Sequence, residues 1–195
     1  GSLLIVSSFD EWSQLEEVIV GRAENANIPS LDTPFQCLHD MRDPNDHTYR
    51  VPKYPAHVLE QANEDLENLV SSLEKMGVVV RRPDSLDNNK TTANLNWKTE
   101  GVATYCPRDI ALICGETIIE TPMTFRSRQN EVNGYKSIFI EYFQHGAKWI
   151  SAPKPLLLDE MYSLGSPQGE RLNNHEPVFD AANVIRAGKD IFYLV

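Results

Sequence analysis

The sequence predicts an α/β fold made of a repeated unit with the order strand, strand, helix, strand. One observation is a run of helical periodicity that ends in a glycine and leads into a short β-prone run and a proline. This order occurs around Gly77 and again around Gly146. A second observation is a pair of β-hairpin patterns, each with an acidic residue shortly before its first strand. Both patterns recur after about 70 residues, and self-similarity at a fixed period indicates a repeat architecture.

The first unit has no clear leading hairpin. Its predicted elements are a strand at 18–20, a helix at 55–76 and a strand at 78–80. Apolar side chains recur every three or four positions along the helix, with acidic side chains between them, and Gly77 suits the left-handed position after its last turn. The segment 22–54 is a long connection rich in Pro, Asn and Asp, and connections of that length are usually functional or disordered.

The second unit is complete and the third contains only its hairpin. The predicted elements of the second are a hairpin at 110–114 and 117–120, a helix at 128–145 and a strand at 148–150. One face of that helix carries Val132, Tyr135, Phe139 and Tyr142. The third hairpin pairs 184–185 with 191–194 through a turn at 187–190. Repeats stabilise one another by stacking, so we expect that more chain follows or that a partner supplies the missing surface.

Asp109 and Asp180 are the candidate functional residues, because each precedes the first strand of a hairpin. If the units are arranged around an axis, both carboxylates could point to the same centre. Each acid has a structural alternative. Asp180 could be a turn or capping acid that accepts backbone N–H groups. Asp109 could pair with its neighbour Arg108, an interaction worth little at a surface.

Arg126 and Arg128 lie at the start of the second predicted helix. A guanidinium fork can hold a carboxylate bidentately, so either residue could bind the carboxylate of a substrate. The alternative, which we prefer, is a structural ion pair with Glu131 or Glu120.

Composition argues against several classes of function. The chain has 18 Lys and Arg against 28 Asp and Glu, a net charge of −10, so we expect neither nucleic acid nor a membrane as partner. The five histidines lack zinc-ligand spacing, and we expect no metal and no cofactor. The three cysteines form no CxxC pair, which favours free thiols in a reducing compartment. No apolar run approaches the roughly 18 residues of a membrane helix, and we expect a cytoplasmic protein.

Five segments carry a pattern that extends over essentially the whole chain. They are EEVIVGRAENA at 16–26, GVVVRRPD at 77–84, CPRDIALICGETIIETPMTFRSR at 106–128, GAKWISAPKP at 146–155 and EPVFDAANVIRAGKDIF at 176–192. In this order they resemble the glycine and inosamine-phosphate amidinotransferases. The resemblance implies a five-fold pseudosymmetric β/α propeller. The present chain would be an N-terminal portion with units near 1–100, 101–170 and 171–195, the last incomplete. A complete propeller would need about 350 to 390 residues.

The resemblance also implies a reaction. The amidino group of L-arginine moves through a covalent cysteine adduct to an acceptor amine, and ornithine is released. Asp180, in the family's FDAAD pattern, would be the catalytic triad aspartate that orients a histidine. Asp109, in the family's PRD pattern, would bind the donor guanidinium. The family's histidine and cysteine lie after the end of this chain. The expected partners are therefore small-molecule substrates, L-arginine and an acceptor amine, with a homodimer as the candidate assembly.

Several positions depart from the family pattern. Asn183 replaces the second aspartate of FDAAD, and Ala103 stands where the family has a tyrosine, with Tyr105 close by. We expect neither Cys106 nor Cys114 to be the nucleophile, since Cys114 lies in a strand predicted to be buried. Two alternatives stay open: a hydrolase of the arginine deiminase kind, and a non-catalytic truncated propeller that binds a guanidino ligand or a partner. The acceptor amine is not determined by these residues.

Overall fold

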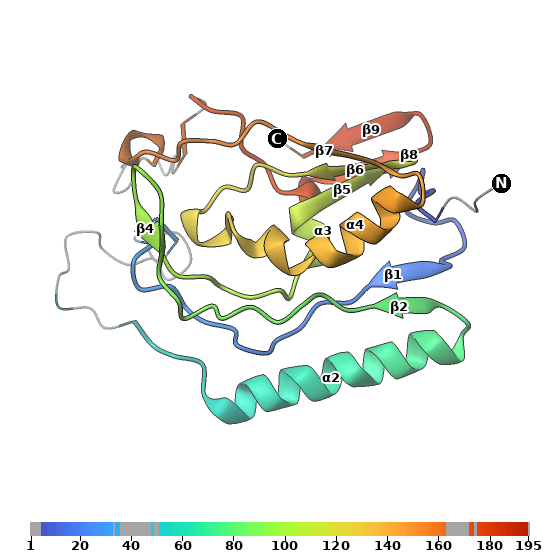
Figure 1. Cartoon of the computed structure of the whole chain (residues 1–195), viewed down its shortest axis with the longest axis horizontal. Coiled ribbons are helices and arrows are strands. Elements are labelled where there is room, and N and C mark those ends of the chain that lie inside the picture. The colour runs from blue at the N-terminus through green and yellow to red at the C-terminus, as the bar shows by residue number, and fades with distance from the viewer. Residues whose placement is uncertain are drawn as a thin grey trace.

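The chain folds into small sheets with helices packed beside them (Figure 1). The computed structural model describes residues 5–32, 34–35, 48, 51–162, 172–173 and 175–194. Its strands are β1 Glu17–Ile19, β2 Val79–Arg81, β3 Thr92–Ala93, β4 Lys98–Thr99, β5 Ala111–Cys114, β6 Thr117–Glu120, β7 Lys148–Ser151, β8 Val184–Ala187 and β9 Asp190–Tyr193. Its helices are α2 Ala56–Lys75, α3 Pro107–Ile110 and α4 Lys136–Gln144, with 3-10 turns η1 Arg126–Arg128, η2 Glu131–Gly134, η3 Asp159–Met161 and η4 Ala181–Asn183. The predicted α/β class is confirmed.

The first unit is a parallel pair of strands, β1 and β2, connected through α2, which lies along the outside of the pair (Figure 1). All three elements match their predicted positions to within one or two residues. Gly77 has a φ of 83°, the left-handed conformation that glycine adopts without a steric penalty. The helix packs through one face, with Leu66 and Val70 against Val20 and Ala23.

Only part of the apolar surface of this unit is buried. The apolar stripe of α2 is buried only near its middle, and Val58, Leu69 and Met76 are exposed. The helix has 20 residues and is about 30 Å long, whereas a three-residue strand spans about 10 Å and leaves the helix ends uncovered. Val79 is also exposed, between buried Val78 and half-buried Val80, because successive side chains of a strand point to opposite faces.

The second unit has the predicted order of strand, strand, helix and strand. β5 and β6 form an antiparallel hairpin, and β7 returns after α4 to pair with β6 in parallel. Gly115 at the hairpin turn has a φ of 59°. The main core lies between this sheet and α4, and its most completely buried side chains are Ile110, Ile118, Tyr135 and Phe139.

The predicted helix at 128–145 is wrong in its first half. Residues 126–134 form the two 3-10 turns η1 and η2, and α4 begins only at Lys136. Gly134, the last residue of η2, packs closely on two other segments: a Cβ atom there would lie 2.6 Å from Cγ2 of Thr104 and 3.0 Å from the carbonyl oxygen of Asp84. The four residues predicted for the buried face are all buried: Val132, Tyr135, Phe139 and Tyr142.

The third unit is the predicted hairpin, β8 and β9, with Gly188 at its turn in the left-handed region at a φ of 68°. The segment of residues 8–10 joins this hairpin to the second one through bridges from Ser8 to Gly115 and from Asp10 to Ala187. Much of the hairpin's apolar surface is exposed: Ile185, Ile191, Phe192, Tyr193 and Leu194 are each open to solvent by about half or more.

The long connection after β1 is packed in its first part. Asn27 and Asp32 are buried, and the backbone of Arg22 pairs with Thr104. The described stretch 22–32 is therefore ordered. Cys37, His39, His47 and Tyr49 lie outside the described residues. Among the helices that the structure describes, none combines the length and the apolar composition needed to cross a membrane.

Candidate functional site

Asp109 and Asp180 lie on neighbouring turns that precede two hairpins. Asp109 is the third residue of α3, and Asp180 is the residue immediately before η4. Arg108 holds the two turns together, because its guanidinium donates to the carbonyl oxygens of Ala181 and Val184, each at 2.6 Å. The backbone of these turns therefore brings the two acids to one place before their side chains interact.

The two acids are not strictly equivalent in the repeat. Counted to the glycine of the following turn, Asp109 is six residues before Gly115, whereas Asp180 is eight residues before Gly188. Asp109 accordingly lies within a helical turn, and Asp180 has an extended backbone at a φ of −97° and a ψ of 145°. Each acid does precede the first strand of its hairpin, as predicted, but the two differ in their distance from the hairpin turn and in backbone conformation.

Arg128 connects the two acids. Its Nη1 donates to Oδ2 of Asp109 at 3.0 Å and lies 3.8 Å from Oδ2 of Asp180. The expectation that both carboxylates could point to one centre agrees with this geometry, and the centre is an arginine side chain of the chain itself. The pattern of residue types did not indicate that contact, because it joins positions far apart in the sequence.

Glu131 holds the opposite edge of the same guanidinium. Nε of Arg128 donates to Oε2 of Glu131 at 2.7 Å, and Nη2 donates to Oε1 at 3.0 Å. The side chain of Glu131 is only 4% exposed. Burial raises the pKa of Glu131 above its ordinary value, and Arg128 opposes that rise. The preferred alternative for Arg128, an ion pair with Glu131, is confirmed.

Asp180 has an unusual environment for a carboxylate. Its Oδ1 is buried and has no hydrogen-bond partner among the described residues. Burial raises the pKa of Asp180, as does the charge of Asp109, whereas Arg128 and a hydrogen bond from the backbone N–H of Thr124 lower it. A buried acceptor without a donor costs about 1 to 3 kcal/mol, which marks the atom as a place where a donor could bind. No side-chain cap involves Asp180, so the alternative of a simple capping acid is not supported.

The remaining structural alternatives are corrected by the contacts of two other arginines. Arg108 pairs with Glu11 and with carbonyl oxygens, and Asp109 takes Arg128 as its ionic partner instead. Arg126 binds the carbonyl oxygen of Leu157 and Oδ1 of Asp159, so its expected pairing with Glu131 or Glu120 is wrong. Arg126 therefore faces away from the two acids.

The two described cysteines do not have the environment of a nucleophile. Cys106, next to α3, is half-buried, and burial together with the charge of Asp109 raises the pKa of its thiol. A nucleophilic thiolate needs the opposite shift. Cys114 is also half-buried, at the end of β5, so its predicted place inside a buried strand is wrong. Burial raises the pKa of this thiol too.

The positions that depart from the family pattern lie close in sequence to the two acids but have different exposures. Ala103 is buried at 7% exposure, and Tyr105 is 46% exposed. Asn183 is exposed in η4, and its carbonyl oxygen accepts a hydrogen bond from the backbone of Leu194.

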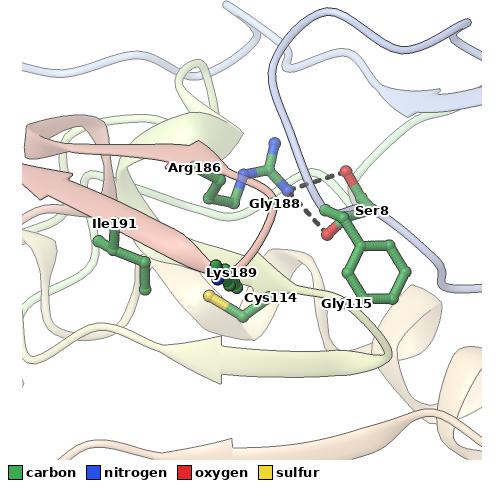
Figure 2. Close-up of a pocket in the computed structure, with 8 residues that line it drawn as sticks. Ser8, Cys114, Gly115, Arg186, Gly188, Lys189 and Ile191 are labelled. Carbon is green, nitrogen blue, oxygen red and sulfur yellow. Dashed lines mark hydrogen bonds between the residues drawn. The ribbon is translucent and has the colours of Figure 1, made fainter.

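A separate pocket lies between the turns of the two hairpins, at the far ends of β5 and β8 from the acids (Figure 2). Cys114, Gly115 and Lys189 contribute to its walls, and Arg186 donates from there to both oxygens of Ser8. Arg186 also binds Glu11 and the carbonyl oxygen of Ile113. Its guanidinium is thus used to join the hairpins to the N-terminal segment.

Comparison with characterised proteins gives the class first: the chain is similar to amidinotransferases. It is 48% identical over 193 residues to inosamine-phosphate amidinotransferase 1 of Streptomyces glaucescens, across 98% of this chain and 55% of that protein. It is 36% identical over 201 residues to the mitochondrial glycine amidinotransferase of Xenopus tropicalis, across 96% of this chain and 48% of that protein. A search against protein-family models gave no match.

Solved structures agree in fold. Inosamine-phosphate amidinotransferase from Streptomyces griseus matches with a TM-score of 0.91 and 45% identity, across 98% of this chain and 55% of that one. An amidinotransferase of the saxitoxin biosynthetic pathway of Microseira wollei matches with a TM-score of 0.82 and 36% identity, across 96% of this chain and 54% of that one. The chain belongs to the family of the inosamine-phosphate and glycine amidinotransferases. It spans about half the length of the curated relatives it matches.

Proposed function

We propose that residues 1–195 supply two acids to the active site of an arginine-dependent amidinotransferase. In this proposal Asp109 binds the guanidinium of L-arginine and Asp180 orients a catalytic histidine. The histidine and the nucleophilic cysteine would come from the part of the protein beyond residue 195. The proposal assigns the protein to the cytoplasm, with L-arginine and an acceptor amine as its substrates and a homodimer as its assembly.

The observation that carries this proposal is the buried Oδ1 of Asp180, which has no donor among the described residues. An imidazole N–H would satisfy that oxygen, and the resulting pair is the arrangement by which an acid fixes the tautomer and orientation of a catalytic histidine. Burial and the nearby Asp109 raise the pKa of Asp180, and a positively charged imidazolium would offset both effects.

Asp109 suits the binding of a guanidinium for an electrostatic reason. One of its oxygens accepts from Arg128, and the described residues donate no hydrogen bond to the other. The cluster holds three carboxylates, Asp109, Asp180 and Glu131, against the single guanidinium of Arg128. When all are ionised, the cluster keeps a net negative charge that attracts a second guanidinium.

The proposed reaction balances in two steps. The cysteine thiolate attacks the central carbon of the arginine guanidinium, the bond from that carbon to the side-chain nitrogen breaks, and the histidine gives that nitrogen a proton as ornithine leaves. The acceptor amine then attacks the same carbon and loses a proton to the histidine, and the thiolate departs. No oxidant or reductant is required.

We also propose that the complete protein is the five-unit β/α propeller expected from the resemblance. The second unit has the full order of strand, strand, helix and strand, and the third repeats its hairpin. In such a propeller the remainder of the chain would provide the helix and strand that complete the third unit. The matched relatives are nearly twice as long as this chain, which agrees with the proposal.

The test uses the complete natural polypeptide that contains these residues. It is incubated with L-arginine, and intact-mass measurement of the protein is combined with chromatography of the released amino acids. We expect an amidino adduct on one cysteine and an equal amount of ornithine. The D180N variant should form little adduct, whereas D190N, which changes an exposed acid on the same third hairpin, should behave as the unmodified protein.

Other products identify the alternatives. Release of citrulline would select a hydrolase of the arginine deiminase kind. Binding of arginine without an adduct or product would select a non-catalytic protein that binds guanidino compounds. Either result would overturn the proposed transfer reaction.

A further inference from the structure

We propose that Arg128 is a positioning residue for the transfer reaction: fixed by Glu131, it sets the separation of Asp109 and Asp180 by donating to one oxygen of Asp109 and facing one oxygen of Asp180. This inference rests on the proposed function, because it assigns Arg128 a role in the same site. It differs from the role considered first for Arg128, which was to bind the carboxylate of a substrate.

The contacts of the guanidinium favour the positioning role over that first role. A guanidinium has five N–H donors in a planar fork. Glu131 takes the edge formed by Nε and Nη2, and Nη1 donates to Asp109 and faces Asp180. Three of the five donors are therefore bound to acids of the chain itself. Arg128 is instead shared among three acids of the chain.

The backbone that carries Arg128 is fixed by buried contacts. The N–H of Ser127 donates to Oδ2 of Asp32, which is fully buried, at 2.9 Å. On the other side, the side-chain amide of Gln129 donates to the carbonyl oxygens of Pro122 and Met123. A side chain held in this way is preorganised, so it can define the positions of groups that it touches.

The contacts of Arg128 also decide which carboxylate oxygens remain for other donors. It interacts with Oδ2 of Asp109 and lies nearest to Oδ2 of Asp180. Oδ1 of Asp180 has no partner among the described residues. Arg128 therefore leaves the other oxygen of each acid for the groups that the proposed function assigns to them, a substrate guanidinium and an imidazole.

The ionised groups around Asp180 come from three elements. Arg128 lies on η1, Asp109 on α3 and Glu131 on η2, and the thiol of Cys106 lies beside Asp109. Arg128 is the positive charge in this set, and it lowers the pKa of Asp180 against the effects of burial and of Asp109. Removing Arg128 leaves three carboxylates near one another, which favours protonation of at least one of them.

Arg126 offers a matched control. It lies on the same 3-10 turn, is buried at 8% exposure, and pairs with Asp159 and the carbonyl oxygen of Leu157. None of these contacts is with Asp109 or Asp180. Substitution of Arg126 therefore tests the loss of a buried arginine without the loss of a contact to Asp109 or Asp180.

The experiment compares R128K and R128M with R126K and R126M in the complete polypeptide. Initial rates of ornithine release give kcat and KM for arginine across a range of pH. In parallel, the carbonyl ¹³C signals of labelled aspartate side chains report the titration of Asp109 and Asp180 without substrate, with D109N and D180N used to assign the signals.

We expect R128K to keep the positive charge but lose the fork, so that kcat/KM falls about 10²-fold, while the acidic limb of the pH profile stays near its original place. R128M should lose more activity, and its acidic limb and the titration of Asp180 should both move to higher pH. R126K and R126M should lose stability, but the acidic limb of their pH profile and the titration of Asp180 should not change.

The inference is overturned by an R128M protein whose pH profile and aspartate titrations match those of R126M, or by an R128K protein whose kcat/KM matches that of R126K. If R128M does not fold, the comparison of kcat/KM between R128K and R126K tests the positioning role. If the unmodified protein releases no ornithine, the proposed function fails, but an unshifted titration of Asp180 in R128M remains the outcome that refutes positioning by Arg128.

Discussion

The two hairpins of this chain share a length, a glycine turn and a preceding acid, yet they differ in what covers them. β5 and β6 are covered by α4 and extended by β7, and Ile118 in β6 is fully buried. Ile191, the residue at the matching position of β9, is 56% exposed. A hairpin pattern therefore determines local strand pairing, while burial depends on the elements that the rest of the unit supplies.

The acids before the hairpins differ in the same way. Asp109 is engaged by Arg128 at 3.0 Å, whereas Asp180 lies at 3.8 Å and keeps one buried oxygen without a described donor. Asp109 therefore has a hydrogen-bond donor within the chain, whereas Oδ1 of Asp180 has none among the described residues. This contrast agrees with different proposed tasks, one toward a substrate guanidinium and one toward a histidine.

The largest expected effect concerns these two acids in catalysis. In the complete polypeptide, D180N should lower kcat by about 10⁴-fold, the size seen when a triad aspartate is replaced by asparagine. D109N should lower kcat/KM for arginine by about 10²-fold, mainly through KM, because a charged hydrogen bond to the substrate is lost. Steady-state kinetics with arginine separates the two. Equal effects on kcat and KM from both variants would remove the proposed division of tasks.

The next effect concerns burial of the matched isoleucines. I118A should lower the free energy of unfolding by about 2 to 5 kcal/mol, because it leaves a cavity in the main core. In residues 1–195 alone, I191A should change it by less than about 0.5 kcal/mol. Urea unfolding of both variants measures the difference. In the complete polypeptide the cost of I191A should increase, and an unchanged cost would argue against a helix and strand that cover β9.

A third effect concerns stability and pH. D109N should destabilise the fold by about 1 to 3 kcal/mol, since it breaks the hydrogen bond to Arg128. D180N should be neutral or stabilising at pH 7. The pKa of Asp180 in the folded state is raised above its unfolded-state pKa of 3.8. Asp180 therefore contributes to the free energy of unfolding at pH values below 3.8, and this contribution is lost as the pH rises through the folded-state pKa. Thermal unfolding from pH 3 to 8 tests this. A D180N protein that is clearly less stable at pH 7 would contradict it.

The smallest effect concerns the turn glycines, which have φ values of 59° at Gly115 and 68° at Gly188. Alanine at either position should cost about 1 to 2 kcal/mol through left-handed strain. G115A should cost slightly more than G188A, because its Cβ atom would lie 2.9 Å from the ring of Phe9, whereas Gly188 has open space. Chemical unfolding of the two variants measures the difference, and the reverse order would show that the N-terminal segment contributes little at Gly115.

The accuracy of sequence-based prediction varied along the chain for physical reasons. α2 and both hairpins follow from local periodicity and glycine turns, and their positions were predicted to within a few residues. The first half of the helix predicted at 128–145 forms 3-10 turns instead, and Gly134 at their end packs closely on Thr104 and Asp84. That contact joins distant segments and leaves no periodic pattern in the sequence.

For the candidate site, the sequence by itself determined the two acids and their place before the hairpins. It also determined the ion pair between Arg128 on η1 and Glu131 on η2, which are three residues apart. Only the tertiary structure decided that Arg128 reaches Asp109 and Asp180, and that one oxygen of Asp180 is buried without a described donor. Residue type and local spacing specify what a side chain can do. The packing of α3 against η4, together with the contacts of Arg128 on η1, fixes which side chains meet, and both depend on contacts between segments remote in the chain.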